Sequence, residues 1–247
     1  MVSEPPGAVE FQRVRSVLAV CAHPDDESFG MGAVISAFVD AGTSVAVLSF
    51  THGEASTLHG VAGDLGRIRA IEFSAAGRWL RVSGTELVDY PDGDLSAQPI
   101  DLLATHVRTE AAAADADTLL VFDLGGITGH PDHVRATQAA LAAAESLDLD
   151  VLAWALPAAV ANGLNVEFGT GFVGLADEEI DHVVHVDRSR QHAAIAQHAS
   201  QSTSNPVLWR RLELLGDTEA LRWLRRARSR TTASVKAVPA ATPKTVR

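Results

Sequence analysis

Four side chains that can bind a cation or carry a proton fall within five positions near the start of the chain. The segment reads CAHPDDESFG, and directly after an apolar run at 16–20 it places His23, Asp25, Asp26 and Glu27. Two neighbouring carboxylates repel each other, so confining them is unfavourable unless a cation or a proton compensates. This cost argues against a polar loop without function and favours a metal site.

A second cluster of the same kind occurs much further along the chain. The segment GITGHPDHVRA at 126–136 contains His130 and His133, again directly after an apolar run. The i, i+3 spacing places two imidazoles on one side of a turn or helix start. Two histidines, one carboxylate and an open position recur in catalytic zinc sites. Together, the two His-Pro-Asp clusters predict a catalytic zinc site.

Two other kinds of site fit the first cluster less well. An acidic phosphoacceptor pocket also lies at strand ends, but it needs a lysine after a later strand, and no lysine precedes Lys236. Such a pocket also has no need of His23. A dinucleotide-binding site needs a G-x-G-x-x-G turn after the first strand, and the sequence has none there.

The elements that must position these residues alternate along the first part of the chain. Apolar and β-branched runs predict buried strands at 17–22, 44–50, 86–90, 118–122 and 151–156. Helical periodicity predicts helices at 31–41, 65–82, 100–114 and 131–145. Such an alternation predicts an α/β fold, Rossmann-like, with a mostly parallel sheet and helices on both faces. In these sheets ligands bind beyond the carboxyl ends of the strands, where both clusters lie.

The second part of the chain is less regular. Residues 157–185 contain glycines and show little periodicity, a strand is predicted at 182–186, and a helix at 188–200. We expect residues 1–228 to form a single domain. Residues 229–247 contain few bulky apolar side chains, and we expect them to form a disordered tail.

Composition limits the classes of protein that remain. The formal net charge is −11, from 20 basic and 31 acidic residues, which argues against a nucleic-acid partner. The single cysteine, Cys21, excludes an intramolecular disulfide and a thiolate metal cluster. The sequence contains no long apolar stretch to span a membrane and no signal peptide at its start, so we expect a cytoplasmic protein.

The two clusters and the residues between them resemble the LmbE/PIG-L superfamily of zinc-dependent de-N-acetylases. Residues 22–27 match the AHPDDE motif of that family, and residues 129–133 match its GHPDH motif. Weaker similarities are T-x-G-E-A at 51–55, R-x-x-E at 69–72, P-D-G at 91–93 and H-x-S-Q at 198–201. The resemblance covers roughly residues 15–205. It implies a Rossmann-like fold and hydrolysis of an N-acetyl amide.

The resemblance also implies roles for the residues of the first motif and their partner. His23, Asp26 and His133 resemble the zinc ligands of the family. Asp25 resembles the general base that takes a proton from the attacking water. Another divalent metal is an alternative to zinc, because availability as well as affinity decides which ion is bound.

Further roles are implied around the second motif. His130 resembles the residue that stabilises the oxyanion or protonates the leaving amine, and Asp132 would orient it. Arg69 and Asp92 resemble residues that hold the hydroxyls of the substrate sugar. Thr128 stands where several sugar deacetylases of the family carry a tyrosine, so this chain offers no phenol at that position.

Some of these residues have ordinary structural explanations. Arg69 and Glu72 have the i, i+3 spacing of a surface ion pair. Asp92 in Pro-Asp-Gly is typical of a turn, and His198-x-Ser200-Gln201 is equally typical of a helix end.

Taken together, the sequence predicts removal of acetyl from an N-acetylglucosamine-type conjugate, a small-molecule substrate. One alternative is an amidase of the same superfamily that cleaves a thiol-conjugate or cofactor amide. The other is a non-catalytic zinc- or sugar-binding module. The presence of Asp25 argues against the module, because a binding protein needs no base.

Overall fold

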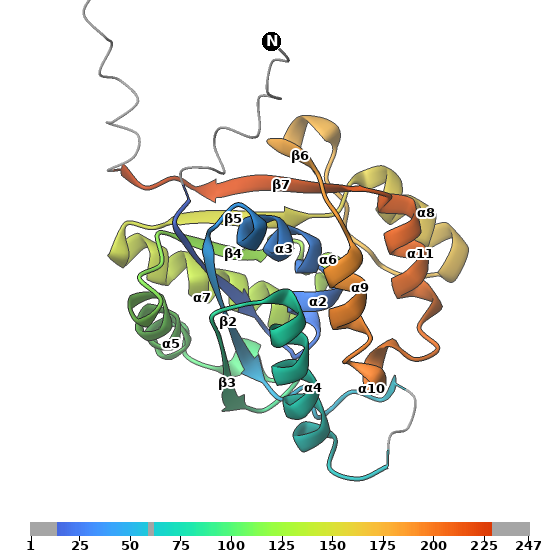
Figure 1. Ribbon diagram of the computed structural model, residues 1–247, viewed down its shortest axis with the longest axis horizontal. Helices are drawn as coiled ribbons and strands as arrows, with labels where there is room; N and C mark the ends of the chain where they lie inside the picture. The colour runs from blue at the N-terminus through green and yellow to red at the C-terminus, as the bar shows by residue number, and fades with distance from the viewer. Residues whose placement is uncertain (1–13, 59–61, 229–247) are drawn as a thin grey trace, which may run out of the picture.

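A single sheet organises the part of the chain that the computed structural model describes, residues 14–58 and 62–228 (Figure 1). Within these ranges the strand order is β3-β2-β1-β4-β5-β7-β6. The strands are β1 (Ser16–Cys21), β2 (Ser44–Thr51), β3 (Gly84–Tyr90), β4 (Thr118–Phe122), β5 (Asp150–Ala155), β6 (His182–His185) and β7 (Thr218–Arg225). Strands β1 to β5 are parallel to one another, and β7 is antiparallel to β5 and β6. The predicted α/β fold with a mostly parallel sheet is confirmed.

Helices cover both faces of this sheet (Figure 1). One face packs against α3 (Gly32–Asp40), α4 (Leu65–Leu80), α8 (Ala158–Phe168), α9 (Ser189–Ile195) and α11 (Pro206–Leu215). The other face packs against α5 (Ile100–Ala113) and α7 (Pro131–Leu147). Short helices α2 (Asp26–Phe29), α6 (Gly126–Gly129) and α10 (Ala199–Ser202) lie in connections, as do 3-10 turns at Leu95–Ala97 and Asp177–Glu179.

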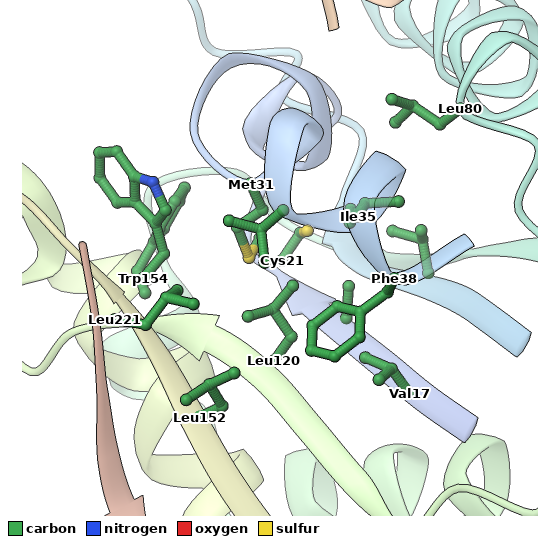
Figure 2. Packing of buried hydrophobic residues seen from close by; sticks show 14 of the residues in the cluster. Val17, Cys21, Met31, Ile35, Phe38, Leu80, Leu120, Leu152, Trp154 and Leu221 are labelled. Atoms are coloured by element: carbon green, nitrogen blue, oxygen red, sulfur yellow. The ribbon is translucent and has the colours of Figure 1, made fainter. Parts of the chain in front are cut away.

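The central strands are buried on both faces because helices cover them. Every residue of β1, β4 and β5 is buried, which explains their continuous apolar sequences. Figure 2 shows Met31, the N-cap residue of α3, and Leu120 of β4 in the packed layer on one face of the sheet, together with Trp154 of β5. Each such side chain contributes about 1.5–3 kcal/mol by its burial. This rigid centre fixes the strand ends from which the two His-Pro-Asp clusters emerge.

The second part of the chain differs from the prediction in several elements. The helix expected at 188–200 is two helices, α9 and α10, because His198 leaves helical geometry with φ −84° and ψ 53°. Helix α8 lies within the segment expected to be irregular, and α11 and β7 were not predicted. The expected tail at 229–247 lies outside the described residues.

Strand β7 lacks the apolar run of the central strands because a charged residue interrupts it at every third position, Glu219, Arg222 and Arg225. Arg222 of β7 pairs with Asp123 at 2.6 Å, and Arg225 pairs with Asp148 at 3.0 Å. Its sequence, TEALRWLR, therefore resembles a basic surface segment although the strand lies between β5 and β6. No helix in residues 14–58 and 62–228 is long and apolar enough to cross a membrane.

Candidate metal centre

The two clusters meet at the carboxyl ends of β1 and β4, which are neighbours in the sheet. The first cluster fills the turn between β1 and α2. The second begins α7, where His130 is the N-cap residue and Pro131 is the first helical residue. Proline suits this position because its missing N–H has no helical partner there. The ends of β1 and β4 and the start of α7 thus place the predicted ligands next to one another.

Three of the predicted residues direct donor atoms toward one point. Nδ1 of His23 lies 3.1 Å from Nε2 of His133, which lies 3.1 Å from Oδ1 of Asp26. Nδ1 of His23 and the carboxylate of Asp26 are 3.8 Å apart. Zinc–nitrogen bonds of about 2.0–2.1 Å in a tetrahedron require donor separations of about 3.3 Å. The set His23, Asp26 and His133 therefore has donor spacings close to those that a metal ion such as zinc requires.

Each donor side chain is also held through its other polar atom. Nδ1–H of His133 donates to the carbonyl oxygen of Gly126 at 3.1 Å. The lone pair on Nε2 is therefore available to a metal ion. The second oxygen of Asp26 accepts the backbone N–H groups of Ala22 and His23, both at 3.0 Å. Nε2 of His23 lies 3.0 Å from a carboxylate oxygen of Asp92. Such contacts orient metal ligands and are typical of metal sites.

Charges around the donors favour a cation. Burial alone would lower the pKa of His23, but the carboxylates of Asp132 and Asp92 raise it to about 10. Burial alone would raise the pKa of Asp26, but His133 and His23 hold it well below its usual range. The negative carboxylates that surround the imidazoles would therefore also stabilise a bound metal cation.

Asp25 lies beside the donor set but does not belong to it. Its backbone has φ 112°, an unusual conformation for a residue with a side chain, and its N–H donates to Glu27 at 2.9 Å. The turn thereby directs neighbouring carboxylates differently. Burial raises the pKa of Asp25 to about 6, although the guanidinium of Arg69 opposes the shift. A carboxylate with that pKa can accept a proton near neutral pH.

Arg69 is buried rather than part of a surface pair. It donates to the carbonyls of Gly53 and Pro24, and its Nη2 lies 3.0 Å from Asp25. Glu72, the partner expected for a surface pair, instead accepts from the N–H and hydroxyl of Ser200. Arg69 therefore joins three segments around the candidate base.

The second motif differs in one detail from the expected arrangement. The carboxylate of Asp132 accepts the N–H groups of Gly93 and Leu95, at 2.8 and 3.1 Å, and lies within 4.8 Å of a ring nitrogen of His130 without a hydrogen bond to it. The backbone N–H of Asp132 donates to Nδ1 of His130 at 3.2 Å instead. Burial and the neighbouring His133 lower the pKa of His130, so the neutral ring carries its proton on Nε2.

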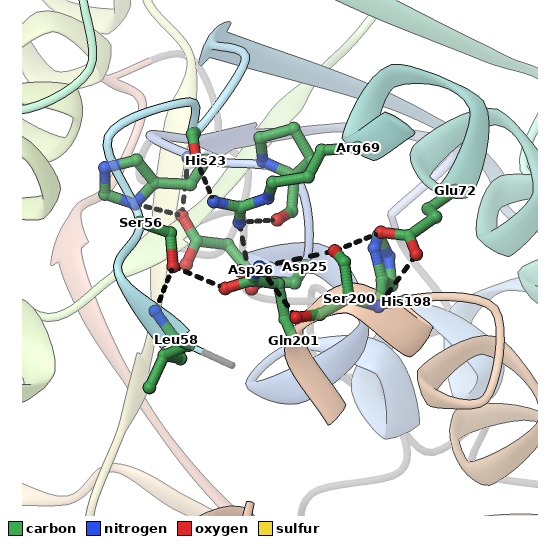
Figure 3. A network of polar contacts seen from close by, with 12 residues as sticks. His23, Asp25, Asp26, Ser56, Leu58, Arg69, Glu72, His198, Ser200 and Gln201 are labelled. Atoms are coloured by element: carbon green, nitrogen blue, oxygen red, sulfur yellow. Dashed lines mark hydrogen bonds and ion pairs between the residues drawn. The ribbon is translucent and has the colours of Figure 1, made fainter. Parts of the chain in front are cut away.

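A buried network behind the turn was not assigned a role from the sequence. Glu27 is fully buried and accepts from Ser28 at 2.6 Å and from Nε2 of His198 at 2.7 Å. Figure 3 shows this region, where Ser200 and Gln201 of α10 meet Glu72 and Ser56. The H-x-S-Q motif was the available signal, but its partners lie far away in the sequence. The turn is thus supported from the C-terminal part of the chain.

A cavity of about 520 Å³ opens over the donor set. His23, Asp25, Asp26, His130 and His133 line it, and so do Arg69 and Asp92. The geometry thus brings all predicted site residues except Asp132 to one cavity, and Asp132 lies 3.4 Å from His23.

Comparison with known proteins agrees with this geometry. Residues 18–144 match the family model described as GlcNAc-PI de-N-acetylase, PIG-L. The chain belongs to the PIG-L family. A relative from Nakamurella multipartita, named 1D-myo-inositol 2-acetamido-2-deoxy-alpha-D-glucopyranoside deacetylase, is 29% identical and is matched over 75% of this chain and 79% of its own length. One of the same name from Saccharomonospora viridis is 34% identical, over 52% of this chain and 58% of its own length.

Solved structures with the PIG-L-type fold are similar in architecture. The zinc-inhibited form of teicoplanin deacetylase Orf2 has a TM-score of 0.65 at 21% identity, covering 84% of this chain and 97% of that one. The N,N'-diacetylchitobiose deacetylase from Pyrococcus horikoshii has a TM-score of 0.64 at 21% identity, covering 87% and 85%. A 4-carboxy-2-hydroxymuconate hydratase from Pseudomonas putida has a TM-score of 0.65 at 16% identity, covering 94% and 100%. The fold alone therefore does not specify the reaction.

Proposed function

We propose that this PIG-L family member is a zinc-dependent hydrolase that removes the acetyl group from an N-acetylglucosamine-type conjugate. The observation that carries the proposal is the convergence of donor atoms from His23, Asp26 and His133 beside Asp25. The family and the names of the relatives support an acetamido sugar as the substrate class.

Asp25 has the position and the pKa for the proton transfers. When bound, zinc supplies a Lewis acid that polarises the amide carbonyl and makes water more acidic. The carboxylate of Asp25 takes a proton from the attacking water as the new C–O bond forms. It then gives that proton to the nitrogen as the C–N bond breaks, so that acetic acid, which ionises to acetate in water, and a free amine leave. A pKa of about 6 permits both transfers near neutral pH.

His130 is suited to stabilise the oxyanion. Because its Nδ1 accepts the N–H of Asp132, its Nε2–H is the group free to donate toward the cavity. A donor held in this way stabilises developing negative charge without rearrangement. Thr128 provides no phenol, so we assign the donor role to His130 alone.

Arg69 and Asp92 line the cavity and contact the site residues themselves. Arg69 holds Asp25, and Asp92 accepts from the backbone of Ala55 at 2.9 Å while it faces His23. We therefore propose that both position site residues as well as the sugar hydroxyls. The paired contacts explain why neither is an ordinary surface residue.

The alternatives differ in what they require of Asp25. A non-catalytic binding module has no use for a partly buried carboxylate in a strained backbone conformation beside the donor set. An amidase that acts on a thiol-conjugate or cofactor amide would use the same groups. A substrate panel separates it from an acetamido-sugar deacetylase.

The test combines metal content with release of primary amine. We expect wild-type protein to hold about one zinc per chain and to release amine from N-acetylglucosaminides. Asp25→Asn should keep the metal and lose about a hundred- to ten-thousand-fold in kcat/KM. Asp89→Asn is the matched control, because the Asp89 side chain is fully exposed. A zinc-loaded wild type that releases no amine from any acetamido sugar would contradict the proposal.

A further inference from the structure

The far wall of the cavity contains a buried arginine. Helix α11 turns Leu208, Arg211, Leu212 and Leu215 toward the core, so Arg211 interrupts an otherwise apolar stripe. Arg211 is 7% exposed and lines the cavity. The adjacent Arg210 lies on the surface, where it pairs with two glutamates. The two neighbours therefore have quite different surroundings.

Arg211 lacks an acidic partner. Its Nη2 donates to the carbonyl of Phe29 at 2.9 Å, and its guanidinium lies 5.7 Å from the ring centre of Trp154. Its Nε has no hydrogen-bond partner. Among residues 14–58 and 62–228, the ion pairs within 4.0 Å include none of Arg211. A buried cation is ordinarily paired, so this arrangement points to an anion from outside the chain.

The nearest internal candidate is already engaged. Glu219 is 1% exposed and accepts from Arg188 at 2.5 Å and from the indole N–H of Trp154 at 2.7 Å. Arg188 also donates to the carbonyl of Thr218 at 2.8 Å, which fixes it on Glu219. Glu219 is thus held by Arg188 and Trp154, and although Glu219, Asp25 and Asp26 act on Arg211 through space, none of them forms an ion pair with it.

Arg211 and Asp92 lie on opposite sides of the donor set. Asp92 follows β3, at one edge of the sheet, whereas Trp154 beneath Arg211 belongs to β5. The donor set lies between them at the ends of β1 and β4. Phe29, Phe122, Ile127 and Phe172 line the cavity, and Phe122 contacts both His133 and Trp154. An apolar wall therefore connects the donor set to the arginine.

We propose that Arg211 binds a carboxylate at the end of the substrate's acyl chain, so that, besides acetyl, the protein hydrolyses N-acyl groups of short dicarboxylic acids. The inference rests on the proposed amide hydrolysis and refines its substrate class. The planar guanidinium binds a carboxylate through paired N–H donors. The apolar wall accommodates the methylene groups between that carboxylate and the scissile amide.

The experiment compares N-acetyl-, N-malonyl-, N-succinyl- and N-glutarylglucosamine as substrates of the zinc-loaded full chain. We expect at least one dicarboxylic derivative to release amine with a kcat/KM no lower than that of N-acetylglucosamine. Arg211→Met should reduce the ratio of the best dicarboxylic derivative to N-acetyl by about ten- to a hundred-fold, the effect of losing a charged hydrogen bond. Arg211→Lys keeps the positive charge but lacks the paired N–H donors of the guanidinium, and it replaces Arg211→Met in the test if that variant does not fold. Arg210→Met is the matched surface control.

Binding of succinate, with acetate as the single-carboxylate control, tests the carboxylate site at Arg211 independently of the proposed hydrolysis. If no derivative releases amine, the proposed hydrolysis fails. The anion site still stands when wild type binds succinate more tightly than acetate and Arg211→Met or Arg211→Lys removes that difference. Equal binding of succinate and acetate by wild type overturns it. So does an Arg211 variant that lowers turnover of all four derivatives by the same factor.

Discussion

Replacing His198 by leucine tests whether the buried network supports the site. His198 and Glu27 are both fully buried, and Nε2 of His198 is 2.7 Å from the Glu27 carboxylate. That carboxylate also accepts from Asp25 and Ser28, but His198 is its only basic partner among the described residues. Removing one partner of a buried pair costs about 3–5 kcal/mol, because the remaining charge stays buried.

For a chain of this size, that loss corresponds to a decrease in Tm of about 6–20 °C. The sign of the pH dependence follows from the pKa of His198. Burial would lower this pKa, but the Glu27 carboxylate raises it above its usual value. The pair's contribution to stability is therefore complete below the unfolded pKa of about 6.5 and is lost as pH rises through the folded pKa.

The assay is thermal unfolding of chelator-treated protein at pH values on both sides of that range. His192→Leu is the matched control, because His192 is exposed on the neighbouring helix. Wild type should lose more stability with rising pH than His198→Leu does. The reasoning is refuted if His198→Leu and His192→Leu unfold at the same temperature.

Two further predictions concern the support of the site. Arg69→Met removes the positive charge that opposes the raised pKa of Asp25, so the pKa of Asp25 should rise above about 6. The acidic limb of the pH profile of kcat/KM should then move to higher pH by about one to three units. A pH profile with an unchanged acidic limb would contradict this. Gly30→Ala places a Cβ 2.4 Å from the Phe122 ring, which packs against His133. We expect the free energy of unfolding, measured with urea, to fall by about 1–3 kcal/mol, and zinc binding to weaken in a metal titration. Gly84→Ala is the control, because its added Cβ would meet open space. Equal effects of the two substitutions would refute the packing argument.

The local sequence predicted the central strands, whose residues are buried on both faces of the sheet. Continuous apolar runs gave the central strands within about a residue, because only a strand covered on both faces is apolar throughout. Strand β7 was missed since Arg222 and Arg225 compensate acidic side chains of other segments. Such compensation depends on distant residues and leaves no periodic pattern.

The sequence by itself also determined that two His-Pro-Asp clusters follow parallel strands, and therefore that they share one edge of the sheet. Only the tertiary structure decided which atoms converge, because backbone hydrogen bonds orient each ring and carboxylate. It placed Arg69 inside the protein and engaged the Asp132 carboxylate with the backbone of Gly93 instead of His130. It also brought Arg211 to the cavity, since that contact depends on how α11 packs against α2 and β5 and on no local spacing in the chain.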